Sequence, residues 1–253
     1  MSSLNASVDE TPASPVVLVT GGSQRLGAQL VRALHTRGMR VVVHYHQSAE
    51  AARALCDELE ARRPGSTMQV CADLVTRTAP ERIVEQIRIH WGRLDVLINN
   101  AAVFRATPLA ASGLDDWDEI TAINLRAPYF LCRAAAPLLR LQRGLIINLA
   151  DIYADRPRPQ YAIYCAAKAG LVGMTRALAR ELAPEIRVNA VAPGAILWSA
   201  DASHEEQQAV LARTPLERLG EPSDIATAVS YLIDAPYVTG QVLTVDGGRS
   251  IFD

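Results

Sequence analysis

The sequence lacks several patterns that would decide its class at once. Its four cysteines, Cys56, Cys71, Cys132 and Cys165, are far apart and form no CxxC pair, which indicates neither a zinc site nor a disulfide framework. No apolar run is long enough to cross a bilayer. The 25 basic and 27 acidic side chains are interspersed and form no basic stripe. We therefore expect no metal site, no membrane partner and no nucleic-acid partner.

The amino-terminal stretch MSSLNASVDETPASP also lacks the basic start and apolar core of a secretion signal. We interpret residues 1–14 as a disordered tail and expect a cytoplasmic protein. Residues 15–253 contain no internal repeat and no long linker, and they are numerous enough to bury a core. We predict a single domain over this range.

The rest of the chain alternates short apolar runs with longer amphipathic segments. Seven runs rich in β-branched residues predict strands at 15–20, 40–45, 68–72, 94–99, 144–150, 186–192 and 241–247. Apolar residues at three- and four-residue spacing predict helices at 29–38, 49–63, 80–91 and 165–183. Strands that are apolar on both faces, joined by right-handed crossovers, give a parallel sheet between helix layers. We predict a doubly wound, Rossmann-like α/β domain, with a substrate flap at about 194–214.

The first predicted strand ends in a glycine-rich turn, TGGSQRLG, at residues 20–27. In doubly wound sheets the ligand lies at the carboxyl ends of the strands, where the strand order reverses. Gly21 and Gly27 permit a tight turn, and the helix N-terminus that follows presents free N–H groups to a phosphate. Taken alone, the motif also fits an ordinary strand-to-helix turn.

The second predicted strand ends without an acidic residue, although an NAD site usually places one there against the ribose 2′-hydroxyl. It offers His44, His46, Gln47 and Ser48 instead, which tolerate a 2′-phosphate, and Arg25 adds positive charge from the loop. This pattern favours NADP over NAD. Solvated strand-end residues are the alternative for the two histidines.

Polar residues also follow the third and fourth strands. Asp73 is placed to hydrogen-bond an adenine amino group, and Asn100 is placed to brace the backbone near the cofactor. Ordinary turn chemistry is the alternative for both, because Asp and Asn are common at strand ends.

Tyr164 and Lys168 are four residues apart on a predicted helix and so share one face. An ammonium group beside a phenol stabilises the phenolate and lowers the pKa of the tyrosine, which can then serve as a general acid near neutral pH. A surface tyrosine with a neighbouring lysine is the alternative. The start of a helix that follows the fifth strand lies beside the expected nicotinamide, which favours the catalytic interpretation.

From Val16 to Gly248 the sequence resembles the short-chain dehydrogenase/reductase family. The matching motifs are TG…LG at 20–27, NNAA at 99–102, AINL with Asn124, YxxxK at 164–168, PG at 193–194 and VDGG at 245–248. Arg25 stands where the family usually has glycine, and Asp151 stands where it has serine, thirteen residues before the tyrosine. Both departures resemble the pteridine reductase branch, as do HYHQSAEAA, ARRPGS, NNAAVFRATPL and GAILW.

The resemblance implies NADPH-dependent reduction of a pterin, a dihydropterin or dihydrofolate. The matching arginine of the branch borders the cofactor phosphates and the pterin, so Arg25 is expected to contact both. Phe104 matches the aromatic residue that sandwiches the pterin against the nicotinamide. Hydride then reduces a ring C=N bond, while Tyr164 with Asp151 supplies the proton.

Other roles follow from the same resemblance. Lys168 is expected to orient the ribose, Asn124 to hold a helix bend and a water chain, and Trp198 to shape the substrate end. The predicted cofactor contacts are Gly21, Arg25, Leu26, His44, Tyr45, His46, Ser48, Asp73, Leu74, Asn100, Ala101, Tyr164, Lys168, Pro193, Gly194 and Ile196. Members of the family are commonly tetramers, so a homotetramer is expected.

Two other functions remain open at this point. A short-chain reductase of a ketone, sugar or acyl substrate shares the fold and most motifs, although Arg25 and Asp151 argue against it. A non-catalytic NADP-binding regulator shares them as well, although the intact pair of Tyr164 and Lys168 argues against that.

Overall fold

Residues 14–198 and 203–251 are described by a computed structural model of the chain. The predicted tail at 1–14 lies outside these residues except for Ser14, and so do residues 199–202 of the predicted flap. Within the described ranges, no helix has both the length and the apolar character needed to cross a membrane.

Seven strands form one parallel sheet in the order β3-β2-β1-β4-β5-β6-β7. The strands are β1 (Val16–Val19), β2 (Arg40–Tyr45), β3 (Thr67–Cys71), β4 (Val96–Asn99), β5 (Leu145–Leu149), β6 (Arg187–Pro193) and β7 (Val242–Val245). Every residue of β1, β4 and β5 is buried, as continuous apolar runs require of central parallel strands. This arrangement confirms the predicted doubly wound α/β fold.

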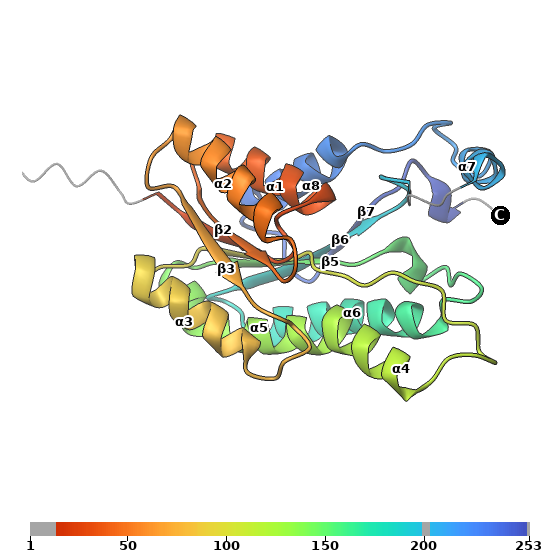
Figure 1. Cartoon of the computed structure of the whole chain (residues 1–253), viewed down its shortest axis with the longest axis horizontal. Helices are drawn as coiled ribbons and strands as arrows, with labels where there is room; N and C mark the ends of the chain where they lie inside the picture. The colour runs from red at the N-terminus through yellow and green to blue at the C-terminus, as the bar shows by residue number, and fades with distance from the viewer. Residues whose placement is uncertain (1–13, 199–202, 252–253) are drawn as a thin grey trace, which may run out of the picture.

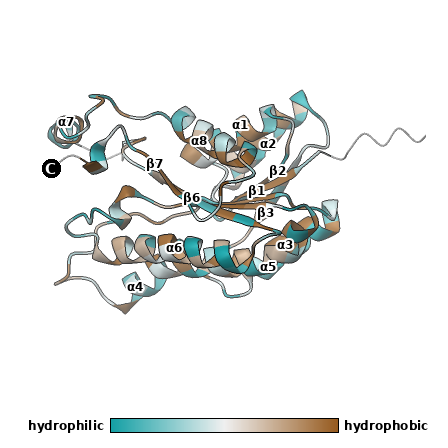
Figure 2. Cartoon of the chain, turned by 180° about the vertical axis from the view of Figure 1, so that it is seen from behind, coloured by the Kyte–Doolittle hydropathy of each residue, from teal (hydrophilic) through white to brown (hydrophobic). Residues whose placement is uncertain are grey.

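Helices cover both faces of the sheet (Figure 1). One face carries α1 (Arg25–Thr36), α2 (Ala49–Arg62) and α8 (Pro222–Asp234). The other carries α3 (Ala79–Trp91), α4 (Leu114–Thr121), α5 (Ala127–Leu141) and α6 (Ala162–Glu181). Each face has its own large apolar cluster against the sheet, and Figure 2 shows the central strands coloured as largely hydrophobic.

A short helix, α7 (His204–Leu211), lies away from both helix layers (Figure 1). It forms inside the segment expected to be a flap, because Ser203 and Glu206 make a capping box. The Ser203 hydroxyl accepts from the Glu206 N–H at 3.2 Å, and the Glu206 carboxylate accepts from the Ser203 N–H at 3.0 Å. None of its residues is buried, so the capping, and not core packing, defines this helix.

Candidate active site

A cavity of about 800 Å³ opens where β1, β4, β5 and β6 end. Small-molecule sites usually enclose about 300 to 1,000 Å³. The predicted site residues in its wall are Arg25, Leu26, Asn100, Phe104, Asp151, Tyr164, Lys168, Pro193, Gly194, Ile196 and Trp198. The other predicted contacts lie outside this wall, and they are Gly21, His44, Tyr45, His46, Ser48, Asp73, Leu74, Ala101 and Asn124.

The glycine-rich turn after β1 packs closely against the end of β4. The Asn100 amide donates to the carbonyls of Thr20 at 2.8 Å and Gly21 at 3.1 Å, which places Asn100 in the bracing position expected from the sequence. A Cβ atom on Gly27 would lie 2.0 Å from the Gly21 oxygen, so only glycine fits there. The start of α1, with its unpaired N–H groups, is thereby held at the cavity end of the sheet.

His44 holds the same turn from the side of β2. Its Nδ1 accepts from the Gly21 N–H at 3.1 Å, so its Nε2 carries the proton and donates to the Ala72 carbonyl at 3.1 Å. The side chain is buried, and burial lowers the pKa of His44 to about 4. The structure therefore differs from the sequence-based expectation: His44 is a neutral brace with both nitrogens engaged by backbone, while His46 is exposed beyond it.

This bracing makes stability depend on pH in a defined window. A histidine with a lowered folded pKa stabilises the fold above its unfolded pKa of about 6.5, and that contribution is lost as the pH falls toward the folded value. We expect the free energy of unfolding to drop by about 2 kcal/mol more between about pH 7.5 and about pH 5 than it does in a His44→Gln variant. Chemical denaturation at both pH values measures this.

Taking the difference between the unmodified protein and His44→Gln cancels the pH dependence that comes from the other titrating groups. His35, whose pKa burial also lowers, is present in both proteins and cancels in the difference. Equal pH dependence in the two proteins would show that His44 does not carry the effect.

Around the expected adenine end, Asp73 shows turn chemistry. Its Oδ1 accepts from the Val75 N–H at 2.9 Å. Ser48 precedes α2, and its hydroxyl accepts from the Ser23 hydroxyl at 3.2 Å, which links the glycine-rich turn to the end of β2.

The centre of the cavity holds three of the predicted catalytic side chains. The Tyr164 hydroxyl and Asp151 Oδ2 are 2.8 Å apart, and Asp151 Oδ1 accepts from the Tyr153 N–H at 2.9 Å. Lys168 Nζ lies 5.7 Å from the Tyr164 ring centroid and donates to the Leu149 carbonyl at 2.7 Å. Asp151 follows β5 and the other two lie on α6, so the sheet and one helix fix all three.

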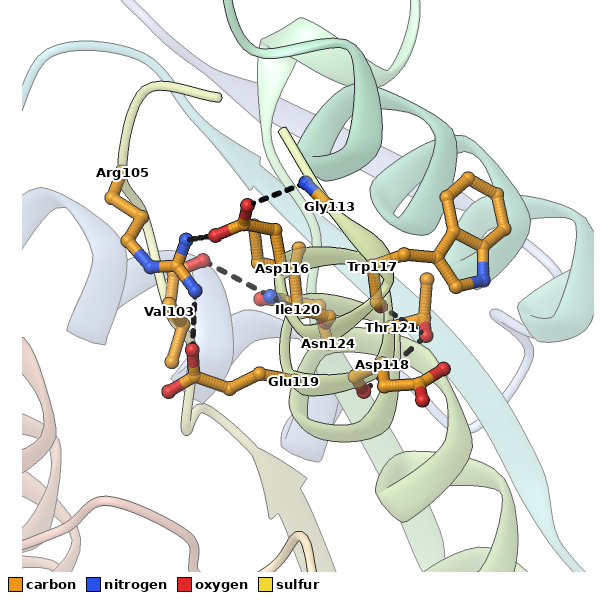
Figure 3. A network of polar contacts seen from close by, with 10 residues as sticks. All are labelled: Val103, Arg105, Gly113, Asp116, Trp117, Asp118, Glu119, Ile120, Thr121 and Asn124. Atoms are coloured by element: carbon orange, nitrogen blue, oxygen red, sulfur yellow. Dashed lines mark hydrogen bonds and ion pairs between the residues drawn. The ribbon is translucent and has the colours of Figure 1, made fainter. Parts of the chain in front are cut away.

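Asn124 lies behind this centre in a π-helical segment, Ala122–Arg126, between α4 and α5. Figure 3 shows its amide directed at the carbonyls of Val103 and Ile120, at 3.0 and 2.9 Å. Its buried Oδ1 has no partner among the described residues, which fits an acceptor for a water molecule. This is the helix irregularity expected at Asn124.

The same view shows a pair of contacts that the sequence reading missed. Arg105 donates to Asp116 at 2.5 Å and to Glu119, so the loop that carries Phe104 is tied to α4 (Figure 3). Opposite charges eleven and fourteen residues apart are too common in sequence to signal such a contact.

Comparison with known proteins decides the family. A family described as enoyl-(acyl carrier protein) reductase matches residues 22–250. Pteridine reductase 1 of Leishmania tarentolae is 36% identical over 283 aligned residues, covering 95% of this chain and 98% of that protein. The 3-oxoacyl-(acyl-carrier-protein) reductase of Synechocystis sp. is 36% identical, covering 94% and 97%. The chain belongs to the short-chain dehydrogenase/reductase family.

A further relative is similar to the same degree. The granaticin polyketide synthase putative ketoacyl reductase 2 of Streptomyces violaceoruber is 39% identical, covering 96% of this chain and 98% of that protein. The short-chain reductase described here is therefore an NAD(P)-dependent oxidoreductase, and overall identity to these relatives does not select a substrate.

The residues of this short-chain reductase fit a nicotinamide cofactor. Gly27 lets the glycine-rich turn pack against the start of α1, and the N–H groups at that helix start suit a diphosphate. Lys168 uses one of its three donors on Leu149, which leaves donors for a ribose in the cavity that it lines.

Burial shifts the pKa values of the three predicted catalytic side chains. It raises the pKa of Tyr164 far above its ordinary value, and the neighbouring Asp151 carboxylate raises it further. Burial also raises the pKa of Asp151, against the hydrogen bonds from Tyr153 and Tyr164, and it lowers the pKa of Lys168 to about 8. The expected lowering of the Tyr164 pKa by Lys168 is thus wrong for this arrangement, because desolvation and the carboxylate outweigh an ammonium that is hydrogen-bonded elsewhere.

Proposed function

We propose that this reductase uses NADPH to reduce a ring C=N bond of a pterin, a dihydropterin or dihydrofolate. The observation that carries the proposal is the 2.8 Å contact between Asp151 and the Tyr164 hydroxyl. A carbonyl reductase of this family usually places a neutral serine hydroxyl there to hold the substrate oxygen. A carbonyl oxygen needs only a neutral hydrogen-bond donor there, whereas a carboxyl group can also release a proton. A ring nitrogen that must gain a proton suits the carboxyl group instead.

The backbone at Arg25 supports the same conclusion. Arg25 has φ of +49°, a left-handed conformation that favours glycine, which the family usually has here. A non-glycine residue held in that region costs about 1 to 3 kcal/mol. Its guanidinium lines the cavity and donates to the Trp198 carbonyl at 3.2 Å. We infer that the side chain is retained, despite the strain, for contacts to cofactor phosphates and to the pterin.

The cavity also has an aromatic wall suited to a flat ring. Phe104 is 44% exposed, and its ring stacks on Tyr161 with centroids 4.6 Å apart. Its edge contact with the catalytic Tyr164, at 4.9 Å, places this wall beside the proton donor. Partly exposed aromatic rings next to the reacting groups suit the binding of a flat pterin.

When bound, NADPH supplies hydride to the carbon of the C=N bond, and the protein supplies the proton. Protonated Asp151 donates its O–H to the Tyr164 oxygen, which frees the tyrosine O–H to face the ring nitrogen. The nitrogen takes the Tyr164 proton, Tyr164 takes the Asp151 proton, and Asp151 regains a proton from water. Burial raises the pKa of Asp151 above its ordinary value, which favours the protonated form that this step requires.

The preference for NADPH over NADH rests on the end of β2. No acidic side chain directly follows Tyr45, and the exposed His46 together with Ser48 occupies the segment where the ribose 2′-phosphate is expected. Arg25, at the first position of α1, adds a cation to this side of the site.

Carbonyl reduction is the second candidate, because relatives named as 3-oxoacyl and ketoacyl reductases are as similar as the pteridine reductase. The Tyr164 and Lys168 pair suits either reaction and disfavours a non-catalytic regulator. A homotetrameric assembly and a cytoplasmic location stay predictions.

Absorbance-monitored consumption of NADPH separates the candidates. We expect turnover of dihydrobiopterin and dihydrofolate with kcat/KM at least about tenfold above that for acetoacetyl thioesters and simple ketones, and NADPH preferred over NADH. Turnover of ketones alone would remove the pterin assignment and leave the family in place. Binding of NADPH without consumption of any substrate would favour the regulator.

A further inference from the structure

One arginine in the cavity wall is anchored on aromatic rings instead of on a carboxylate. The guanidinium carbon of Arg158 lies 4.7 Å from the centroid of Tyr161 and 5.9 Å from those of Phe104 and Tyr153. Stacking of this kind holds a guanidinium by its flat face. The N–H donors lie in the guanidinium plane, so they stay available to a ligand.

A second arginine approaches the same ring. The guanidinium carbon of Arg249 lies 5.6 Å from the Tyr153 centroid, and its Nη2 donates to the Tyr153 hydroxyl at 3.2 Å. Tyr153 follows Asp151 closely in the chain and gives its N–H to that carboxylate. Both arginines line the same cavity, and both contact the Tyr153 ring.

The charges of these two arginines are not balanced by ion pairs. Among the ion pairs of residues 14–198 and 203–251, neither Arg158 nor Arg249 takes part. Arg105, in the same wall, contrasts with them because it contacts two carboxylates.

Among the described residues, the two carboxylates of the wall form no ion pair with either arginine. Asp151 contacts Tyr164 and interacts with the charge of Arg249 only at longer range, and Glu206 caps α7. The substrate end of the cavity therefore holds positive charge that an anion would complement.

We infer that Arg158 and Arg249 form a subsite for an anionic group attached to the substrate, beyond the part that is reduced. The ligand chemistry is a carboxylate or a phosphate. On the proposed function, on which the choice of ring rests, the anion is the carboxylate of a pteroylglutamate side chain. A ring that stacks on Phe104 has its substituent near Arg158, because the two are 5.9 Å apart. If the substrate is a thioester, the anion is the phosphate of its carrier.

Calorimetric titration of the NADP⁺-loaded protein tests the subsite with two pairs of ligands. Folate and biopterin differ in the charged side chain, and acetoacetyl-CoA and the uncharged acetoacetyl-N-acetylcysteamine differ in the phosphates. We expect Arg158→Gln and Arg249→Gln each to raise the dissociation constant of the charged member of one pair by about tenfold. The dissociation constant of its uncharged counterpart should stay within about twofold of that of the unmodified protein. Higher salt should weaken only the charged ligand.

Two further variants separate charge from packing. Arg158→Lys retains the cation and should restore much of the affinity, whereas Arg156→Gln removes an exposed arginine of the same loop, outside the cavity wall, and should change nothing. A loss of affinity for folate but not for biopterin identifies a carboxylate as the ligand. A loss of affinity for the CoA thioester alone identifies a phosphate, which supports the subsite and contradicts the pterin proposal. Equal losses for charged and uncharged ligands, or no loss in either pair, would overturn the subsite.

Discussion

The Asp151→Asn variant is expected to reduce dihydrobiopterin with a kcat about 10²-fold or more below that of the unmodified reductase. The amide has nearly the size of the carboxyl group, and its oxygen can still accept from the Tyr153 N–H, which Asp151 Oδ1 does at 2.9 Å. It cannot release a proton to Tyr164. The NADPH dissociation constant, measured by fluorescence titration, should stay within about twofold, because the change affects the proton path and not the cofactor cradle.

The pH profile distinguishes this role from a structural one. A reaction that needs protonated Asp151 proceeds below the Asp151 pKa and slows as the pH rises through it, and burial raises that pKa above its ordinary value. This fall in kcat with rising pH should be absent from the pH profile of Asp151→Asn. A change in kcat that persists near pH 8 in the variant belongs to Lys168, whose pKa burial lowers to about 8.

Asp151→Ser serves as the matched second variant. It installs the neutral hydroxyl that the family's carbonyl reductases usually carry, so dihydrobiopterin reduction should fall as in Asp151→Asn while reduction of an acetoacetyl thioester is retained or increased. Dihydrobiopterin turnover that survives in both variants would contradict the proton path from Asp151.

The strands were predictable because central parallel strands are buried on both faces and leave uninterrupted apolar runs. The helices were less predictable from the sequence than the strands. α5 contains Pro137, a residue that disfavours a helix interior, and α7 buries no residue and lacks the apolar periodicity of α1 or α3. The π-helical segment at Asn124 depends on a hydrogen bond to Val103, which lies 21 residues away in the chain, and a local pattern cannot reveal it.

Within the site, residue spacing predicted the side chains that share one helical face. It did not predict contacts between segments that are distant in the sequence. Tyr164 and Lys168 share a helical face, and the structure brings them together. The neutral state of His44 follows from its burial between two backbone groups. Arg158 and Arg249, ninety-one residues apart, both contact the Tyr153 ring, and no spacing rule links them.

The Tyr164→Phe variant is expected to show the largest loss. It removes the group that transfers the proton, so kcat for dihydrobiopterin should fall by about 10³-fold, within the range that general acids contribute. The ring of Tyr164 is buried and contacts the edge of Phe104, and phenylalanine preserves both. Loss of one hydrogen bond should lower the free energy of unfolding by about 1 kcal/mol, so thermal unfolding shows whether the variant is folded.

Tyr161→Phe is the matched control for Tyr164→Phe, since Tyr161 belongs to the same aromatic wall and stacks on Phe104. It should retain kcat within about twofold, because of these two tyrosines it is Tyr164 whose hydroxyl contacts Asp151, at 2.8 Å. Binding of NADPH should persist in both variants, since Lys168 keeps its hydrogen bond to the Leu149 carbonyl. Equal losses in the two variants would assign the effect to packing of the wall. If Tyr164→Phe keeps more than a tenth of the activity, another group is the proton donor. The proposed reason for an aspartate at position 151 would then fail as well.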